Sequence, residues 1–197
     1  VPGGIVHGEI HIPVSGTFNN PVLGNAAALI AAMLTACGLS PEAIAAGFAA
    51  YQPLPHRFQT LGTLRGVTFI DDSKATSLAA TQAALRMVGG RVRLIAGGRL
   101  KEQDLDFLED DLRQFALHAY LIGEAQEPLR QAWQHMLPCT PCGTLSAAVA
   151  QAFADAAPGD TILLSPGAAS FDQYTGMGAR GNDFAAQMKC LSQLPTT

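Results

Sequence analysis

After residue 53 the sequence alternates regularly between short apolar runs and amphipathic stretches, and few folds can satisfy such a pattern. Four runs have the length and composition of buried strands, at residues 67–71, 92–96, 119–122 and 161–164. Stretches with helical periodicity lie between and after them, at residues 78–87, 105–115, 128–136, 145–156 and 183–191. Strands that alternate with helices predict a mostly parallel sheet, because right-handed crossovers keep the strands parallel and place helices on both faces.

The first 52 residues follow a different pattern. Apolar and polar residues alternate over residues 1–14, which suggests a short strand or hairpin arm without a core of its own. Residues 25–37 are strong helix formers that stop at Gly38, and Ser40 with Pro41 predicts the start of a second helix that runs to about Ala50. We therefore expect an α/β, Rossmann-like domain over residues 53–197, preceded by the arm and two helices over residues 1–52.

Composition and charge exclude several classes of protein. Hydrophobic residues make up 48% of the chain and charged residues 14%, which is enough apolar material for a core. A formal net charge of -4 without a basic run argues against a general nucleic-acid-binding surface. No apolar stretch approaches the ~20 residues that span a bilayer, and no signal peptide is recognisable, so we expect a cytoplasmic setting.

Four cysteines are too few for a disulfide scaffold in a chain of 197 residues. Cys139 and Cys142 have the spacing of redox and zinc sites, but no second cysteine pair supplies further ligands. We expect a short strand or loop with two incidental thiols, and a redox or zinc site is the alternative.

Polar loops follow three of the predicted strands, where parallel sheets bind their ligands. The first loop, residues 71–77, combines acidic residues with Lys74 and Thr76 ahead of a helix, where an anion is favoured, although Ser77 or Thr76 could simply cap that helix. The second, residues 97–104, has paired glycines that allow close backbone approach, together with Arg99 and Lys101.

The third loop, residues 165–174, contains small residues followed by Ser170 and Phe171, a composition suited to a carboxylate. A nucleophilic serine is the rival interpretation, but G-x-S-x-G is absent and no histidine lies in these loops to act as its base. All three loops should meet at one edge of the sheet and form an anion site. Composition and spacing do not name the anion.

Taken together, these segments resemble the C-terminal domain of the Mur ligases. The resemblance rests on residues 54–59 (LPHRFQ), 71–76 (DDSKAT) and 165–173 (SPGAASFDQ), whose order and approximate spacing are similar to those of the D-glutamate-adding members. It covers about residues 53–190. Ser77 stands where the family usually has Asn, and Gly176 with Met177 replaces an Asn-Phe pair.

The resemblance implies roles for individual residues. Arg57 and Asp72 would contact ATP, the arginine near the phosphates and the acid near the ribose. Lys74 would lie beside the reacting groups as the catalytic residue. D-glutamate would be bound by a set of residues from all three loops: Thr76, Lys101, Ser170, Phe171 and Met177.

The resemblance also implies the reaction and its ligands. ATP, used with Mg²⁺, would phosphorylate the carboxylate of UDP-N-acetylmuramoyl-L-alanine, and the amine of D-glutamate would then attack the acyl phosphate. Cationic side chains suit this chemistry because negative charge accumulates on the phosphoryl and tetrahedral oxygens. The product would serve peptidoglycan synthesis.

No G-x-x-x-x-G-K-S/T sequence occurs in the 197 residues, so the chain lacks a Walker A loop for the ATP phosphates. Residues 1–52 resemble only the closing strand and helices of the family's central ATP-binding domain. We therefore expect a fragment that lacks the N-terminal and most of the central domain, holds no cofactor and is inactive alone. Two alternatives remain, namely a ligase of the same superfamily for another amino acid and a non-catalytic Rossmann-like anion-binding module.

Overall fold

The computed structural model describes residues 4–7, 10–13, 18 and 21–193. The chain divides into two compact units, Val1–Pro53 and Leu54–Thr197. Within the described ranges no helix has the length and apolar character needed to cross a membrane.

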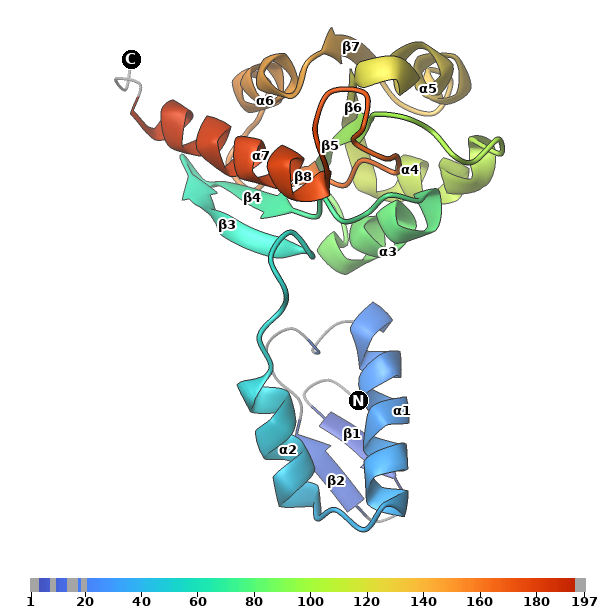
Figure 1. Ribbon diagram of the computed structural model, residues 1–197, viewed down its shortest axis with the longest axis vertical. Coiled ribbons are helices and arrows are strands. Elements are labelled where there is room, and N and C mark those ends of the chain that lie inside the picture. Colours follow the sequence, from blue (N-terminus) through green and yellow to red (C-terminus); the bar gives the residue numbers. More distant parts are fainter. Residues whose placement is uncertain (1–3, 8–9, 14–17, 19–20, 194–197) are drawn as a thin grey trace. The chain divides into compact units, whose positions relative to one another are not determined.

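The first unit contains a β-hairpin and two helices (Figure 1). Strand β1 (Gly4–His7) pairs antiparallel with β2 (Ile10–Pro13), and helices α1 (Pro21–Ala36) and α2 (Pro41–Ala50) follow. Its small core is formed by a few apolar side chains from these elements: Ile12, Ala27, Ala31, Ile44 and Phe48. The hydroxyl of Ser40 accepts a hydrogen bond from Ala43 N, which confirms the predicted start of α2.

The second unit is built on a six-stranded sheet with the order β3-β4-β8-β5-β6-β7. Its strands are β3 (Gln59–Leu64), β4 (Val67–Asp71), β5 (Val92–Gly97), β6 (Ala116–Ile122), β7 (Cys139–Gly143) and β8 (Thr161–Leu164). All neighbours pair in parallel except β3 and β4. The last strand in the sequence, β8, therefore lies between the two that open the parallel part, β4 and β5.

Helices cover both faces of this sheet, as the alternating pattern predicts (Figure 1). On one face, α3 (Leu78–Val88), α4 (Glu109–Phe115) and α5 (Gln126–Trp133) pack into a core that includes Leu85, Leu112 and Trp133. On the other face, α6 (Leu145–Ala154) and α7 (Met177–Ser192) contribute Val149 and Phe184 to a second core. Burial on both faces explains why the central strands are continuously apolar.

Strand β3 was not predicted from the sequence. It is half exposed, contains Gln59, Thr60 and Thr63, and pairs with β4 at the edge of the sheet. The turn between the strands is made by Arg65 and Gly66, both with positive φ (52° and 78°), which suits a tight hairpin. An edge strand needs only one apolar face, and this one is too polar to stand out in the sequence.

Three helix starts lie four or more residues from the predicted ones. That of α4 is Glu109 instead of residue 105, because a short 3₁₀ helix, Asp106–Leu108, precedes it. Helix α1 begins at Pro21 instead of residue 25, and α7 begins at Met177 instead of residue 183. Gly178 and Gly181 disguise the first turns of α7, because glycine is a poor helix former. Gly181 has a packing role, since a Cβ atom there would collide with the His56 ring.

Candidate functional site

The end of β4 carries two adjacent carboxylates with different environments. Asp71 is fully buried; its Oδ2 lies 2.7 Å from His56 Nδ1, and its Oδ1 accepts a hydrogen bond from Ser73 N at 2.9 Å. These contacts hold the chain that precedes β3 against the end of β4. Asp71 and His56 are therefore occupied with each other, and neither was assigned a role from the sequence.

Asp72 points toward the neighbouring strand β8. Its Oδ1 accepts a hydrogen bond from Phe58 N at 3.1 Å, and its Oδ2 accepts one from Ser165 Oγ at 3.0 Å. Burial raises the pKa of Asp72 to about 6, an effect that these two hydrogen bonds only partly oppose. A buried carboxylate with a raised pKa, at the sheet edge where ligands bind, is typical of a functional site.

The glycine loop after β5 is held tightly against its neighbours. Gly97 and Gly98 have φ values of 125° and 126°, and added Cβ atoms would collide with the carbonyl oxygens of Ile122 and Ala169. Arg99 and Ala169 exchange backbone hydrogen bonds of 2.8 and 2.9 Å. Glycine is thus required for the close approach between this loop and the loop after β8.

The loop after β8 is bonded to both of the others. Gly97 N donates to Pro166 O at 2.9 Å, and Gly167 N donates to Ala75 O at 3.0 Å. The backbone from residue 161 to residue 170 is buried throughout, and Ser170 is only 2% exposed. Because β8 lies between β4 and β5, the three loops form one hydrogen-bonded surface at the carboxyl edge of the sheet.

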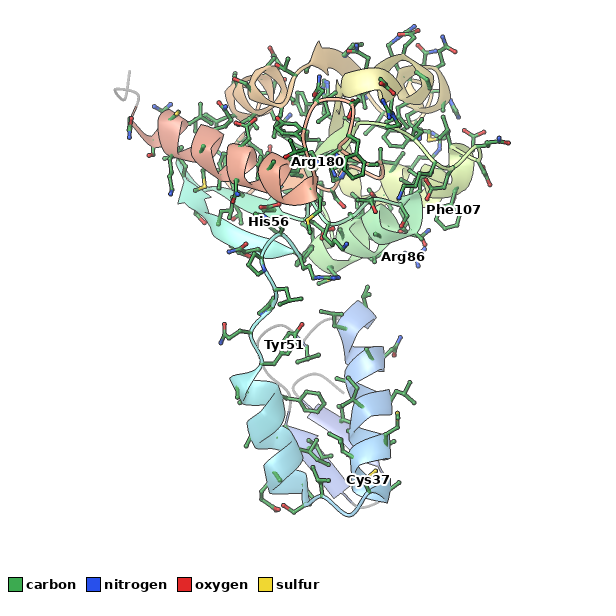
Figure 2. The ribbon with its side chains drawn as sticks, viewed as in Figure 1. Cys37, Tyr51, His56, Arg86, Phe107 and Arg180 are labelled. Atoms are coloured by element: carbon green, nitrogen blue, oxygen red, sulfur yellow. The ribbon has the colours of Figure 1, made fainter. Side chains whose placement is uncertain are left out.

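Arg180, a residue of α7 that is labelled in Figure 2, is hydrogen-bonded to all three loops. Its guanidinium donates to Ser73 Oγ (3.0 Å), Ser73 O (2.9 Å), Gly97 O (3.4 Å) and Ala168 O (3.1 Å). The residue is 1% exposed, and its burial lowers the pKa of the guanidinium to about 10. Arg180 was not assigned a role from the sequence.

Four of the residues predicted to bind ligands, contributed by the three loops, have polar side-chain groups without a partner from the described ranges. Among the described residues, none makes a side-chain hydrogen bond or ion pair with the polar groups of Lys74, Thr76, Lys101 or Ser170. Lys74, Lys101 and Arg57 are exposed, and Thr76 is half-buried. These exposed and half-buried donors are open to an anion from solvent, whereas Ser170 is only 2% exposed.

Phe171 and Met177, two further residues predicted to contact D-glutamate, lie in the loop after β8 and at the start of α7. Phe171 is 66% exposed directly after the buried Ser170 and presents an aromatic ring to solvent. Met177 is the first residue of α7, and its carbonyl oxygen accepts a hydrogen bond from Ser73 Oγ at 2.8 Å. The 176–177 turn is therefore linked to the loop after β4.

The positive charge expected from Arg99 is largely neutralised. Its guanidinium makes two hydrogen bonds to Glu124, of 2.9 and 3.1 Å, and both side chains are more than half exposed. Ser77 caps α3, which is the alternative to ligand binding that the sequence left open: its hydroxyl accepts a hydrogen bond from Ala80 N. Lys101 thus remains the unpaired cation of the second loop.

The cysteines and the acidic residues give no sign of a metal centre. Within the described part of the chain, no three His, Cys, Asp or Glu side chains are grouped so that they could hold a metal ion. Cys139 and Cys142 are free thiols in β7, and burial raises the pKa of both, that of Cys139 to about 11. A thiol that resists ionisation is a poor metal ligand and a poor nucleophile.

Comparison with known proteins identifies the family. The family model described as "Mur ligase, glutamate ligase domain" matches residues 56–167, more than half of the chain. The chain belongs to the Mur ligase family. This match spans the loops after β4, β5 and the start of the loop after β8.

Two curated relatives show which of the Mur ligases this chain is similar to. The chain is 47% identical over 154 residues to a UDP-N-acetylmuramoylalanine--D-glutamate ligase of Dinoroseobacter shibae, covering 77% of this chain and 32% of that protein. It is 46% identical over 167 residues to the ligase of the same name from Ruegeria pomeroyi, covering 84% and 34%. The chain therefore spans about a third of the length of these curated Mur ligases.

Solved structures support the fold. The murein peptide ligase Mpl of Psychrobacter arcticus superposes with a TM-score of 0.62 at 14% identity, over 97% of this chain and 41% of that one. A pseudomurein peptide ligase type C from Methanothermus fervidus gives 0.64 at 16% identity, over 93% and 39%. The α/β architecture with a mostly parallel six-stranded sheet is thus that of Mur ligases.

Proposed function

We propose that this chain is the acceptor-binding, C-terminal portion of an ATP-dependent ligase that adds D-glutamate to UDP-N-acetylmuramoyl-L-alanine. The observation that carries the proposal is the hydrogen-bonded surface formed by the loops after β4, β5 and β8, with unpaired donors on it. The names of the relatives support D-glutamate as the amino acid. The corresponding reaction is amide formation through an acyl phosphate in peptidoglycan synthesis.

The proposed binding of D-glutamate uses donors from all three loops. The Thr76 hydroxyl and the Lys101 ammonium bind one carboxylate, and Ser170 with the following turn binds the other. Phe171 and Met177 supply apolar walls beside the carbon chain. Binding a dicarboxylate with two separated sets of donors explains why the site needs loops from three strands.

Lys74 is the proposed catalytic residue. Its exposed ammonium lies in the loop after β4, between Asp72 and Thr76, and so between the proposed nucleotide and amino-acid contacts. ATP phosphorylates the carboxylate of the nucleotide substrate, and the D-glutamate amine then displaces phosphate to form the amide. A fixed cation stabilises the negative charge that develops on the phosphoryl and tetrahedral oxygens.

Arg57 and Asp72 are the proposed ATP contacts. Asp72 is suited to accept a hydrogen bond from a ribose hydroxyl, and the charge of Arg57 acts on this carboxylate and favours its ionised form. The rest of the nucleotide site, including a phosphate-binding loop, would come from other parts of the ligase, and the chain alone would be inactive.

Nuclear magnetic resonance titration of this chain tests the proposal. D-glutamate should shift the backbone amide signals of Thr76, Lys101 and Ser170, with weak, millimolar affinity because part of the site is absent. Lys101→Ala should remove these shifts, whereas Lys189→Ala, which removes an exposed lysine near the other end of α7, should leave them unchanged.

Parallel titrations separate the alternatives. Stronger shifts from L-glutamate or D-aspartate than from D-glutamate would indicate a superfamily ligase for another amino acid. Shifts from inorganic phosphate alone, with none from any amino acid, would favour the non-catalytic anion-binding module. ATP- and D-glutamate-dependent phosphate release by this chain would contradict its proposed inactivity.

A further inference from the structure

Arg180 is the only described residue whose side chain bonds to the loops after β4, β5 and β8 at once. Ser73 belongs to the first loop, Gly97 ends β5 and begins the second, and Ala168 belongs to the third. These bonds use both terminal nitrogens and Nε, so the planar fork is fixed in one orientation. A single rigid group therefore sets the spacing of three segments that are far apart in the sequence.

The surroundings of the Arg180 guanidinium differ from those of most buried arginines. Buried guanidinium groups are normally paired with a carboxylate, because an uncompensated charge is costly in the protein interior. Within the described ranges, no acidic side chain lies within ion-pair distance of this one. Asp172 and Asp71 lie close enough to favour its charged form, but neither accepts a hydrogen bond from it, and all the acceptors of Arg180 are carbonyl oxygens or the Ser73 hydroxyl.

The position of this charge relates it to the proposed ligand. Two of the three carbonyl groups that Arg180 engages, Gly97 O and Ala168 O, belong to the glycine and alanine turns adjoining Arg99 and Ser170, on the surface proposed to bind carboxylates. Drawing carbonyl oxygens inward onto the guanidinium keeps these acceptors away from an incoming anion. The positive charge behind the turns also complements an anion in front of them.

We infer that Arg180 is the positioning residue of the amino-acid site: it holds the three loops in register and places a positive charge, to which no carboxylate is directly bonded, behind the bound dicarboxylate. The part of this inference that concerns the ligand rests on the proposed function. The part that concerns the loops does not. Hydrogen exchange tests the part that concerns the loops, and ligand selectivity tests the part that concerns the ligand.

Amide hydrogen exchange tests the positioning of the loops. In Arg180→Lys and Arg180→Met, the amides of Arg99 and Ala169 should exchange at least about tenfold faster, because hydrogen bonds from a charged donor stabilise their closed state. Amides between β6 and β7 should keep their rates, and so should the amides of Arg99 and Ala169 in the control Arg113→Met, which changes an exposed side chain of α4. Unchanged exchange at Arg99 and Ala169 would overturn the inference.

A measurement on the unmodified chain covers the case in which the variants do not fold. The Nε–Hε proton of Arg180 should exchange slowly with water, since its nitrogen donates to Ser73 Oγ inside the protein. An Hε proton that exchanges as fast as that of the exposed Arg113 would refute the buried clamp.

Ligand selectivity tests the role of the charge, which a merely structural clamp would not affect. The unmodified chain and Arg180→Lys should prefer D-glutamate to D-glutamine, which has the same length but one carboxylate fewer. Arg180→Met should lose about tenfold of this preference, as expected for one charge at short range. Equal preference in the Met variant and the unmodified chain would show that the charge has no such role.

The two kinds of failure are distinguishable. If the unmodified chain binds neither amino acid, the proposed function loses support and the electrostatic part of the inference falls with it. The exchange rates of Arg99, Ala169 and the Arg180 side chain then still decide whether Arg180 positions the loops.

Discussion

Replacing Asp72 by asparagine should stabilise the folded chain near neutral pH, although the change removes a residue proposed to contact ATP. The Asp72 carboxylate is largely buried and accepts hydrogen bonds from Phe58 N and Ser165 Oγ. An asparagine keeps an oxygen for Phe58 N, and its amide can donate to Ser165 Oγ. The variant therefore keeps two hydrogen bonds but no longer requires a charge to be buried.

The magnitude follows from the pKa of Asp72, which burial raises from 3.8 to about 6. A difference of about 2 pKa units corresponds to about 3 kcal/mol, an upper value for the destabilisation by the ionised form. The folded pKa is raised, so the folded state binds the proton more tightly than the unfolded state. The wild-type chain thus loses stability as the pH rises from about 4 to about 6, and the loss is complete above that range.

Urea unfolding of both proteins near pH 4 and near pH 7.5 measures this effect. The free energies of unfolding should be similar near pH 4, and Asp72→Asn should be more stable by about 1–3 kcal/mol near pH 7.5. Asp104→Asn, which neutralises an exposed carboxylate in the loop after β5, should show no such dependence. A difference between Asp72→Asn and wild type that does not change with pH would refute the reasoning.

Gly98→Ala should destabilise the chain by about 3 kcal/mol or more in urea unfolding, because the new methyl group collides with Ala169 O. Gly90→Ala, also at positive φ but in open space, should cost only about 1 kcal/mol; equal costs would contradict the close approach. Burial lowers the pKa of His118 below 6.5, so its contribution is present above that pH and lost as the pH falls. In His118→Phe the free energy of unfolding should depend less on pH in this range, and an unchanged pH dependence would exclude His118 as its cause. With its pKa raised to about 11, Cys139 should react with a thiol reagent about 100-fold more slowly near pH 8 than the two exposed cysteines, and zinc should not alter its rate.

Much of the second unit was predictable because its elements have strong local signals. Continuous apolar runs marked β4, β5, β6 and β8, since these strands are buried on both faces. Capping residues marked other boundaries, as Ser40 did for α2. The edge strand β3 and the first turns of α7 escaped prediction, because polar residues and glycines carry weak local preferences that tertiary packing overrides.

The candidate site divides in the same way. Its loops were recognisable by their place after apolar strands and by residue types, as with Lys74, Lys101 and Ser170. The distant residues that form hydrogen bonds with these loops could not be recognised from the sequence. The bond from Ser165 to Asp72 spans 93 positions and that from Arg180 to Ser73 spans 107, and no local pattern encodes such pairs.

The sequence by itself determined the class of the fold, the identity of the three loops and the family resemblance. These properties depend on periodicity and on short runs of residues, which are readable one segment at a time. Only the tertiary structure decided that β8 inserts between β4 and β5, that Arg99 is paired with Glu124, and that the buried Arg180 is bonded to all three loops. Strand order and the burial of a charge depend on which distant segments pack together, and that is a property of the whole folded chain.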